Sequence, residues 1–305
     1  WAIYVQYSNF AREVAAALSV VLIVLAICLL YMETKTRGKA KYYNVSASTH
    51  RLQHSIRLGI WRWPAVLFCT SVVSFSLIMP ISILVYWVIR GVSFGEHIVI
   101  PWSQLGNTLY VSGLAALVAV VAALPIIILS IRYPGRISTL LERCGYMGFA
   151  LPGIVVALSM VFFVIRFATP LYQTIPLLIF SYLILFLPAA LGSINTSFLQ
   201  VNPKLDEAAR ILGKTPLKAF TTVTLPLLIP GLLAGAAMVF LLAMKELPAT
   251  LILGPIGFKT LATSIWWATE DAFFTKAAVP ALLLIIASII PMTFLVSFDQ
   301  KEKIS

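Results

Sequence analysis

Long apolar runs alternate with short polar segments along most of this 305-residue chain. A helix that crosses a membrane needs about 20 consecutive, predominantly apolar residues. Seven stretches meet this requirement, namely 14–32, 63–89, 105–131, 144–165, 177–199, 226–244 and 277–298. The pattern therefore predicts an all-α membrane protein with about seven transmembrane helices.

The distribution of lysine and arginine indicates the orientation, because cytoplasmic loops of membrane proteins carry an excess of these residues. The segment after the first apolar run is rich in them, as are residues 132–143, residues 200–224 and the C-terminal residues. Residues 91–104 and 168–176 contain neither. Counting the crossings from run to run agrees with this distribution and places residues 200–224 in the cytoplasm.

The composition is that of a chain that lies in lipid. Hydrophobic residues make up 60% of the sequence and charged residues 11%, whereas soluble domains have about 45–50% and about 25%. The net charge of +11 is compatible with nucleic-acid binding, but the basic residues fall between the apolar runs and form no single amphipathic face. We therefore expect membrane lipid, and no nucleic acid, around this chain.

Cysteine and histidine give no indication of a metal site. Cys28, Cys69 and Cys144 lie far apart, and their spacing matches neither a metal site nor a disulfide framework. His50 and His54 share one helical face in a basic segment, which suits a solvated surface or, alternatively, a metal-binding pair. We predict no catalytic residue, no metal site and no cofactor bound by this chain.

The polar segment 202–226, NPKLDEAARILGKTPLKAFTTVTLP, separates two apolar runs and is called the 202–226 loop. Asn202 is a candidate N-cap, and Pro203 suits the first turn of a helix. Gly213 is the residue type that most easily adopts a positive φ and ends a helix. The loop is therefore predicted to form two short helices separated at Gly213, the second of which ends before Pro226.

The spacing of residues in this loop resembles the cytoplasmic EAA loop of ABC-importer permeases. The matching residues are Glu207-Ala208-Ala209, Gly213, Val223 at the usual isoleucine, and Leu225-Pro226. In that family the loop is a coupling helix, which docks on the ATPase subunit and passes ATP-driven movement to the membrane helices. The resemblance assigns ATPase coupling to Asp206, Glu207, Ala208, Ala209, Gly213, Lys214, Leu225 and Pro226. The alternative is an ordinary charged loop between two spans.

The resemblance also implies a fold and partners. Six of the spans would form an ABC type I importer permease unit in the bacterial inner membrane, with two ABC ATPase subunits, an extracytoplasmic binding protein and a second permease half. Gly213-Lys214-Thr215 copies the end of a phosphate-binding loop, but Ala208 stands where that motif needs a glycine. We therefore expect that this chain is not an enzyme and that ATP acts through the partner subunit.

The first apolar run is additional to the six that a permease unit needs. We predict residues 1–33 as the last span of a preceding permease half, 34–62 as a basic cytoplasmic linker, 63–299 as the six-span permease domain and 300–305 as a cytoplasmic tail. On this hypothesis the chain is a fragment of a tandem permease whose first half is fused upstream.

Two groups of residues lie near the predicted outer side. Charges near lipid are unfavourable and tend to face protein or water-filled cavities. Lys245 and Glu246 are therefore candidates either for a pathway or gate, or for an interfacial pair that reaches water. Residues 251–278 contain no apolar run long enough to span, and their adjacent tryptophans suit a helix in the membrane interface. Candidate contacts for the binding protein are Trp266, Trp267, Glu270 and Asp271.

The substrate assignment depends on resemblance alone. Residues 245–255, KELPATLILGP, and residues 145–153 look like the corresponding regions of ferric-iron importer permeases. Thiamine and phosphonate permeases share much of this pattern and remain alternatives. A secondary transporter or channel, the alternative from another class, predicts ionisable residues at mid-membrane, whereas the span centres contain no Asp, Glu or Lys.

Overall fold

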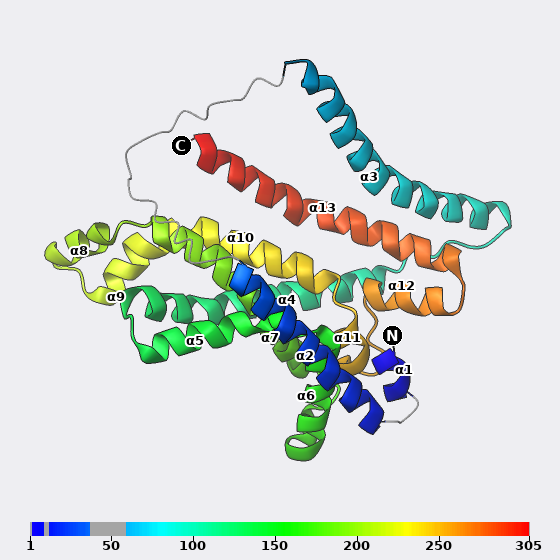
Figure 1. Ribbon diagram of the computed structural model, residues 1–305, viewed down its shortest axis with the longest axis horizontal. Coiled ribbons are helices and arrows are strands. Elements are labelled where there is room, and N and C mark those ends of the chain that lie inside the picture. Colours follow the sequence, from blue (N-terminus) through cyan, green and yellow to red (C-terminus); the bar gives the residue numbers. More distant parts are fainter. Residues whose placement is uncertain (1, 9–11, 37–58, 305) are drawn as a thin grey trace.

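The computed structural model describes residues 2–8, 12–36 and 59–304, and within these ranges every regular element is a helix (Figure 1). The α-helices are α1 (Ala2–Ser8), α2 (Arg12–Thr36), α3 (Arg62–Ser93), α4 (Trp102–Arg132), α5 (Arg136–Tyr146), α6 (Gly153–Phe167), α7 (Ile175–Gln200), α8 (Pro203–Ile211), α9 (Pro216–Ala219), α10 (Leu225–Met244), α11 (Pro248–Leu253), α12 (Leu261–Glu270) and α13 (Phe274–Ile304). Short 3₁₀ turns lie at Gly59–Trp61, Met147–Ala150 and Thr169–Leu171, and a π turn lies at Phe220–Thr224. The prediction of an all-α membrane protein is confirmed.

Six of the seven predicted spans correspond to apolar helical segments long enough to cross a membrane. Five are single stretches, at Gly59–Ser93, Trp102–Arg132, Ile175–Gln200, Pro216–Met244 and Phe274–Thr293. A sixth consists of Arg136–Ala150 and Gly153–Phe167, joined at a bend of 112°. The apolar part of α2, Glu13–Leu29, is shorter than these. The number of seven is therefore not confirmed for the described part of the chain.

The predicted span 144–165 is not one straight helix. The chain turns at Leu151 and Pro152, and Pro152 has an extended backbone (φ −64°, ψ 136°). Proline also disfavours the helical conformation in the residue before it, and the extended Leu151 (φ −95°, ψ 122°) separates α5 from α6. α5 begins at Arg136, within a basic segment predicted to be a loop, because its amphipathic surface packs against α4 and α7.

Three helices, α4, α7 and α10, pack against one another and form the centre of the bundle. α4 contributes a face of alanines, and Ala115, Ala119 and Ala123 are at most 1% exposed. α10 approaches α7 through Gly231, where a Cβ would lie 2.2 Å from Ser197 Oγ. Small residues allow helix backbones in membranes to come close, and this close packing stabilises their association.

The 147–150 turn packs against α7 where the helical hydrogen bonding of α7 is interrupted. Pro188 lies inside α7 and has no N–H, so the carbonyl of Ile184 loses its usual helical donor. Gly148 lies directly against this carbonyl, because a Cβ on Gly148 would be 2.0 Å from the Ile184 oxygen. The missing side chain at Gly148 therefore lets the turn rest on α7 just before the chain bends into α6.

Figure 1 shows the long helices running between two ends of the molecule. One end holds α8 and α9, and the other holds α12 and the start of α4. α3 packs along α13, where a Cβ at Gly91 would lie 2.1 Å from Thr275 Cγ2. Most of the predicted linker 34–62, including His50 and His54, lies outside the described residues, and the predicted division into domains stays a prediction.

α12 runs alongside α13 (Figure 1). This orientation differs from the interfacial helix that the adjacent tryptophans suggest. Leu261 and Ala262 are buried, because α12 also packs on α4. The Leu261 N–H donates to Thr108 Oγ1 of α4 at 2.8 Å, and the amide of Asn107 donates to the Lys259 carbonyl at 2.9 Å. These two hydrogen bonds join the start of α12 and the residues just before it to α4.

Candidate functional site

The 202–226 loop protrudes from one end of the bundle as α8 and α9 (Figure 1). Asn202 caps α8, since the Lys204 N–H donates to Asn202 Oδ1 at 3.0 Å, and Pro203 occupies the first turn. Such a cap satisfies one of the N–H groups that a helix start leaves unpaired. The predicted start of the first short helix is confirmed.

Gly213 ends α8 with a φ of +86°, in the left-handed region that favours glycine. The Lys214 N–H donates back to the Ala209 carbonyl at 3.1 Å, which pairs one of the last carbonyls of the helix. Two short helices separated at Gly213 are therefore confirmed. A helix, and not a strand, precedes Gly213, so Gly213-Lys214-Thr215 lacks the strand context of a phosphate-binding loop.

The second piece does not end before Pro226, contrary to the prediction. α9, the π turn and α10 form one continuous helical stretch, Pro216–Met244. Pro226 has no N–H for the carbonyl four residues earlier, and the widened turn accommodates it: the Leu225 N–H donates to the Phe220 carbonyl, five residues back. The loop is thus connected to α10 without a break.

The motif residues of the 202–226 loop differ in exposure. Glu207 and Ala208 are exposed, whereas Ala209 is 6% exposed. α8 packs against α9 and the π turn, which accounts for the burial of Ala209. The structure therefore leaves Glu207 and Ala208 available on the outer surface of α8, while Ala209 holds the loop together.

Three further motif residues, Lys214, Leu225 and Pro226, lie in the second half of the loop. The Lys214 ammonium donates to Thr222 Oγ1 at 2.9 Å and so connects the start of the second piece to the π turn. Leu225 is half-buried and Pro226 exposed, both in the first turn of α10. Lys214, Leu225 and Pro226 therefore shape the connection to α10.

Apolar side chains project from the tip of the 202–226 loop, and sequence reasoning missed them. The exposed fractions are 47% for Leu205, 86% for Ile211, 82% for Leu212 and 73% for Leu217. Glu207, Lys214 and Lys218 are exposed around them. An apolar patch with a polar rim is typical of a protein–protein contact. The sequence did contain a signal for this patch, because large apolar residues occur in a segment that is too polar to enter the membrane.

An ion pair joins the 202–226 loop to the core. Arg132 is the last residue of α4, and its Nη1 lies 3.4 Å from Asp206 Oδ2 of α8. The two side chains are 21% and 22% exposed, so solvent screens their attraction less than that of a fully exposed pair. The guanidinium also lies over the ring of Phe198, 5.5 Å from its centroid. Arg132 therefore holds α8 against the end of α4.

Lys245 and Glu246 follow α10 and have different surroundings. Lys245 is exposed, whereas Glu246 is half-buried. Glu246 Oε1 accepts a hydrogen bond from the Ala249 N–H at 3.1 Å, and a Cβ at Gly153 would lie 2.6 Å from the same oxygen. Both neighbours lie at helix starts, where partial positive charge favours a carboxylate. The Glu246 carboxyl is thus paired with the Ala249 N–H, and a pathway or gate role for Lys245 and Glu246 stays a prediction.

The four candidate contacts for a binding protein lie on or next to α12, at the opposite end from the 202–226 loop (Figure 1). Trp266 is half-buried and meets Tyr4 edge to face, with ring centroids 5.9 Å apart. Trp267, Glu270 and Asp271 are exposed. Their contact with a binding protein stays a prediction. Within the described ranges no three His, Cys, Asp or Glu side chains gather into a group that could hold a metal ion.

Two sequence relatives match nearly the whole chain. The chain is 35% identical over 308 residues to the Fe(3+)-transport system permease protein FbpB 2 of Haemophilus influenzae, covering 98% of this chain and 60% of that protein. It is 23% identical over 316 residues to the ferric transport system permease protein FbpB of Actinobacillus pleuropneumoniae, covering 97% of this chain and 45% of that protein. The chain therefore spans less than two thirds of the length of either relative.

A solved structure shares the fold. The bacterial alginate ABC transporter, crystallised with an alginate pentasaccharide-bound periplasmic protein, aligns with a TM-score of 0.59 and 14% identity over 79% of this chain and 96% of that chain. Residues 115–303, more than half of the sequence, match the family model described as the binding-protein-dependent transport system inner membrane component. This match includes the 202–226 loop and the helices on both sides of it, so the chain belongs to the family of inner-membrane components of binding-protein-dependent transport systems.

Proposed function

We propose that this chain is the membrane permease part of an ATP-driven ABC importer for ferric iron. A binding protein delivers the substrate at the end that holds α12, and two ABC ATPase subunits contact the 202–226 loop at the other end. ATP is hydrolysed in those subunits, and this chain contributes a conformational change without a covalent step. A second permease half, fused upstream in the tandem arrangement, completes the pathway.

The exposed apolar tip of the 202–226 loop is the observation that carries this proposal. Ile211 and Leu212 are more than four-fifths exposed, and apolar surface in water is unfavourable unless a partner covers it. The loop is held in shape by the Asn202 cap, the Gly213 turn and the Arg132–Asp206 ion pair. A partner would therefore meet a preformed surface, which reduces the entropy lost on docking.

The names of the two sequence relatives support ferric iron as the substrate, since each relative matches almost the whole chain. We expect cells that contain the full transporter to accumulate radiolabelled ferric iron in an ATP-dependent manner, and to accumulate neither thiamine nor a phosphonate. Uptake of thiamine or a phosphonate without iron would contradict the substrate but not the importer. Uptake that follows an ion gradient and ignores ATP would contradict the importer and favour a secondary transporter or channel.

The Arg132–Asp206 ion pair should transmit movement between the 202–226 loop and α4. In Arg132→Glu two carboxylates face each other, so the attraction between α8 and α4 is lost. Because the interaction free energy of a partly exposed ion pair is roughly 1 kcal/mol, we expect ATP-dependent uptake to fall about fivefold. Asp206→Arg should have a similar effect. Because the combined exchange restores opposite charges, the double variant should recover most of the uptake, which a double-mutant cycle in proteoliposomes would measure.

Arg136→Glu is the matched control for this cycle, because it makes the same charge change as Arg132→Glu at an exposed position of α5, outside the 202–226 loop. Its uptake should remain close to that of the unchanged protein. If the double exchange is no better than the two single changes combined, the ion pair does not transmit the movement.

A further inference from the structure

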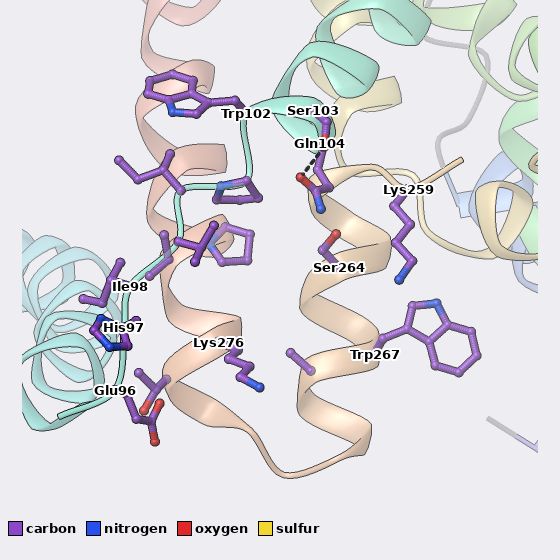
Figure 2. A pocket seen from close by; sticks show the side chains of 17 residues that line it. Glu96, His97, Ile98, Trp102, Ser103, Gln104, Lys259, Ser264, Trp267 and Lys276 are labelled. Carbon is purple, nitrogen blue, oxygen red and sulfur yellow. Dashed lines mark hydrogen bonds between the residues drawn. The ribbon is translucent and has the colours of Figure 1, made fainter. Parts of the chain in front are cut away.

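A groove of about 560 Å³ opens at the end of the bundle opposite the 202–226 loop (Figure 2). Residues 96–104, which include the connection from α3 to α4, form one wall. α12 and the residue before its cap, Lys259, form another, and the first turns of α13 form the third. Small-molecule sites occupy about 300–1,000 Å³, so the groove is large enough for a ligand of headgroup size.

Hydrogen-bond donors and positive charges line this groove. Lys259 and Lys276 project into it from different segments (Figure 2). Ser103 Oγ donates to Gln104 Oε1 at 2.9 Å, which leaves the NH₂ group of Gln104 for a ligand. The hydroxyl oxygen of Ser264 is buried and has no hydrogen-bond partner among the described residues. These groups together favour a ligand that carries several acceptor oxygens and a negative charge.

The two lysines are attached to fixed parts of the structure. The side-chain amide of Asn107 in α4 holds the Lys259 carbonyl at 2.9 Å. The Lys276 ammonium lies 4.5 Å from the centroid of the Phe273 ring. Glu96 is the one carboxylate in the lining, and it lies at the end of the groove away from Lys259 (Figure 2). The two lysines outnumber this carboxylate, so positive charge predominates in the lining.

The position of the groove matches the headgroup layer of a membrane. The Gly59–Ser93 span ends beside it, and the spans that start at Trp102 and Phe274 begin beside it. Trp102 and Trp267 line it, and tryptophan is enriched at this depth. The rest of the lining is largely apolar, with Ile98, Val99, Ile100, Val279 and Pro280. A ligand with an anionic head and an apolar body fits both kinds of wall.

We propose that this groove binds the phosphate group of an anionic membrane phospholipid. Lys259, Lys276 and Ser264 contact the phosphate oxygens, and the acyl chains lie along the exposed surfaces of α3 and α13. Phosphate oxygens accept several hydrogen bonds and carry the charge that ammonium groups attract. The inference is independent of the proposed substrate and of ATPase coupling, because it depends only on the groove and on its depth in the membrane.

Native mass spectrometry of the purified full chain, titrated with phosphatidylglycerol, tests this proposal. We expect the unchanged protein to hold one lipid tightly. The dissociation constant should rise about threefold in Lys259→Gln or Lys276→Gln and about tenfold in the double variant, because each change removes a charge-assisted contact. Arg166→Gln is the matched control, because it removes one positive charge from an exposed site at the end of α6, outside the groove. Its affinity should be unchanged.

Each alternative result has a defined meaning. Equal lipid binding by all variants would show that the bound lipid is non-specific, and this result would overturn the proposal. Binding of inorganic phosphate alone, with no retained phosphatidylglycerol, would assign the groove to a free anion. Unchanged lipid binding together with lost docking of an extracytoplasmic binding protein in the lysine variants would assign it to that protein. Equal melting temperatures for all variants would show that the lysine changes do not act through misfolding.

Discussion

Replacing both Ile211 and Leu212 with glutamate should abolish ATP-dependent uptake while the protein still inserts into the membrane. The two side chains are 86% and 82% exposed, so the change removes no packing within this chain. In the proposed complex they are buried against the ATPase subunit, where disrupting a central contact costs about 2–4 kcal/mol, roughly a 30- to 900-fold loss of affinity. Radiolabelled uptake and co-purification of the ATPase subunits measure the effect.

A conservative double variant separates docking from a general effect of mutation. Ile211→Val with Leu212→Met keeps the tip of the 202–226 loop apolar and should retain most of the uptake. The thermal melting of both double variants should match that of the unchanged protein. Normal uptake and normal co-purification in the glutamate variant would show that the ATPase does not dock at this tip.

Gly148→Ala should lower the melting temperature of the purified protein by roughly 5–10 °C. The added Cβ would lie 2.0 Å from the Ile184 carbonyl oxygen, and a backbone atom cannot move aside as the end of a side chain can. Overpacking costs about 1–3 kcal/mol, and this site belongs at the upper end of that range. The expected damage is to the contact between the 147–150 turn and α7.

Gly192→Ala is the control for this prediction, because Gly192 also lies in α7 and a Cβ there would meet nothing within 4 Å. Its melting temperature should change little, and alanine should even favour the helix slightly. Equal melting temperatures for the two variants would contradict the close contact at Gly148.

Features that depend on neighbouring residues could be predicted from the sequence. The spans follow from the length of the apolar runs, and the two short helices of the 202–226 loop follow from Asn202, Pro203 and Gly213, which act on the backbone within one turn. The family resemblance also depends on local spacing, and the family model includes that segment. Local rules therefore sufficed to predict the two short helices of the 202–226 loop, while the coupling role of its residues stays a prediction.

Features that depend on distant contacts could not be predicted. Pro152 separates two helices at a sharp bend, whereas a π turn lets the helix continue through Pro226. The proline residue is the same in both places, so its effect depends on the surrounding backbone. The partners of Glu246 likewise come from α11 and α6, and the exposure of Ile211 depends on how α8 packs. Such contacts require the folded chain.

α4 joins the end of the molecule that holds the 202–226 loop to the end that holds α12. Arg132 at one end pairs with Asp206, and Asn107 near the other end holds the carbonyl of Lys259. A helix of 31 residues is about 46 Å long, and its smooth alanine face, centred near Ala119, lies close to its midpoint. If α4 tilted as a rigid body about that face, its two ends would move in opposite directions. In the proposed importer, one such movement would reach the binding-protein contact and the ATPase contact at the same time.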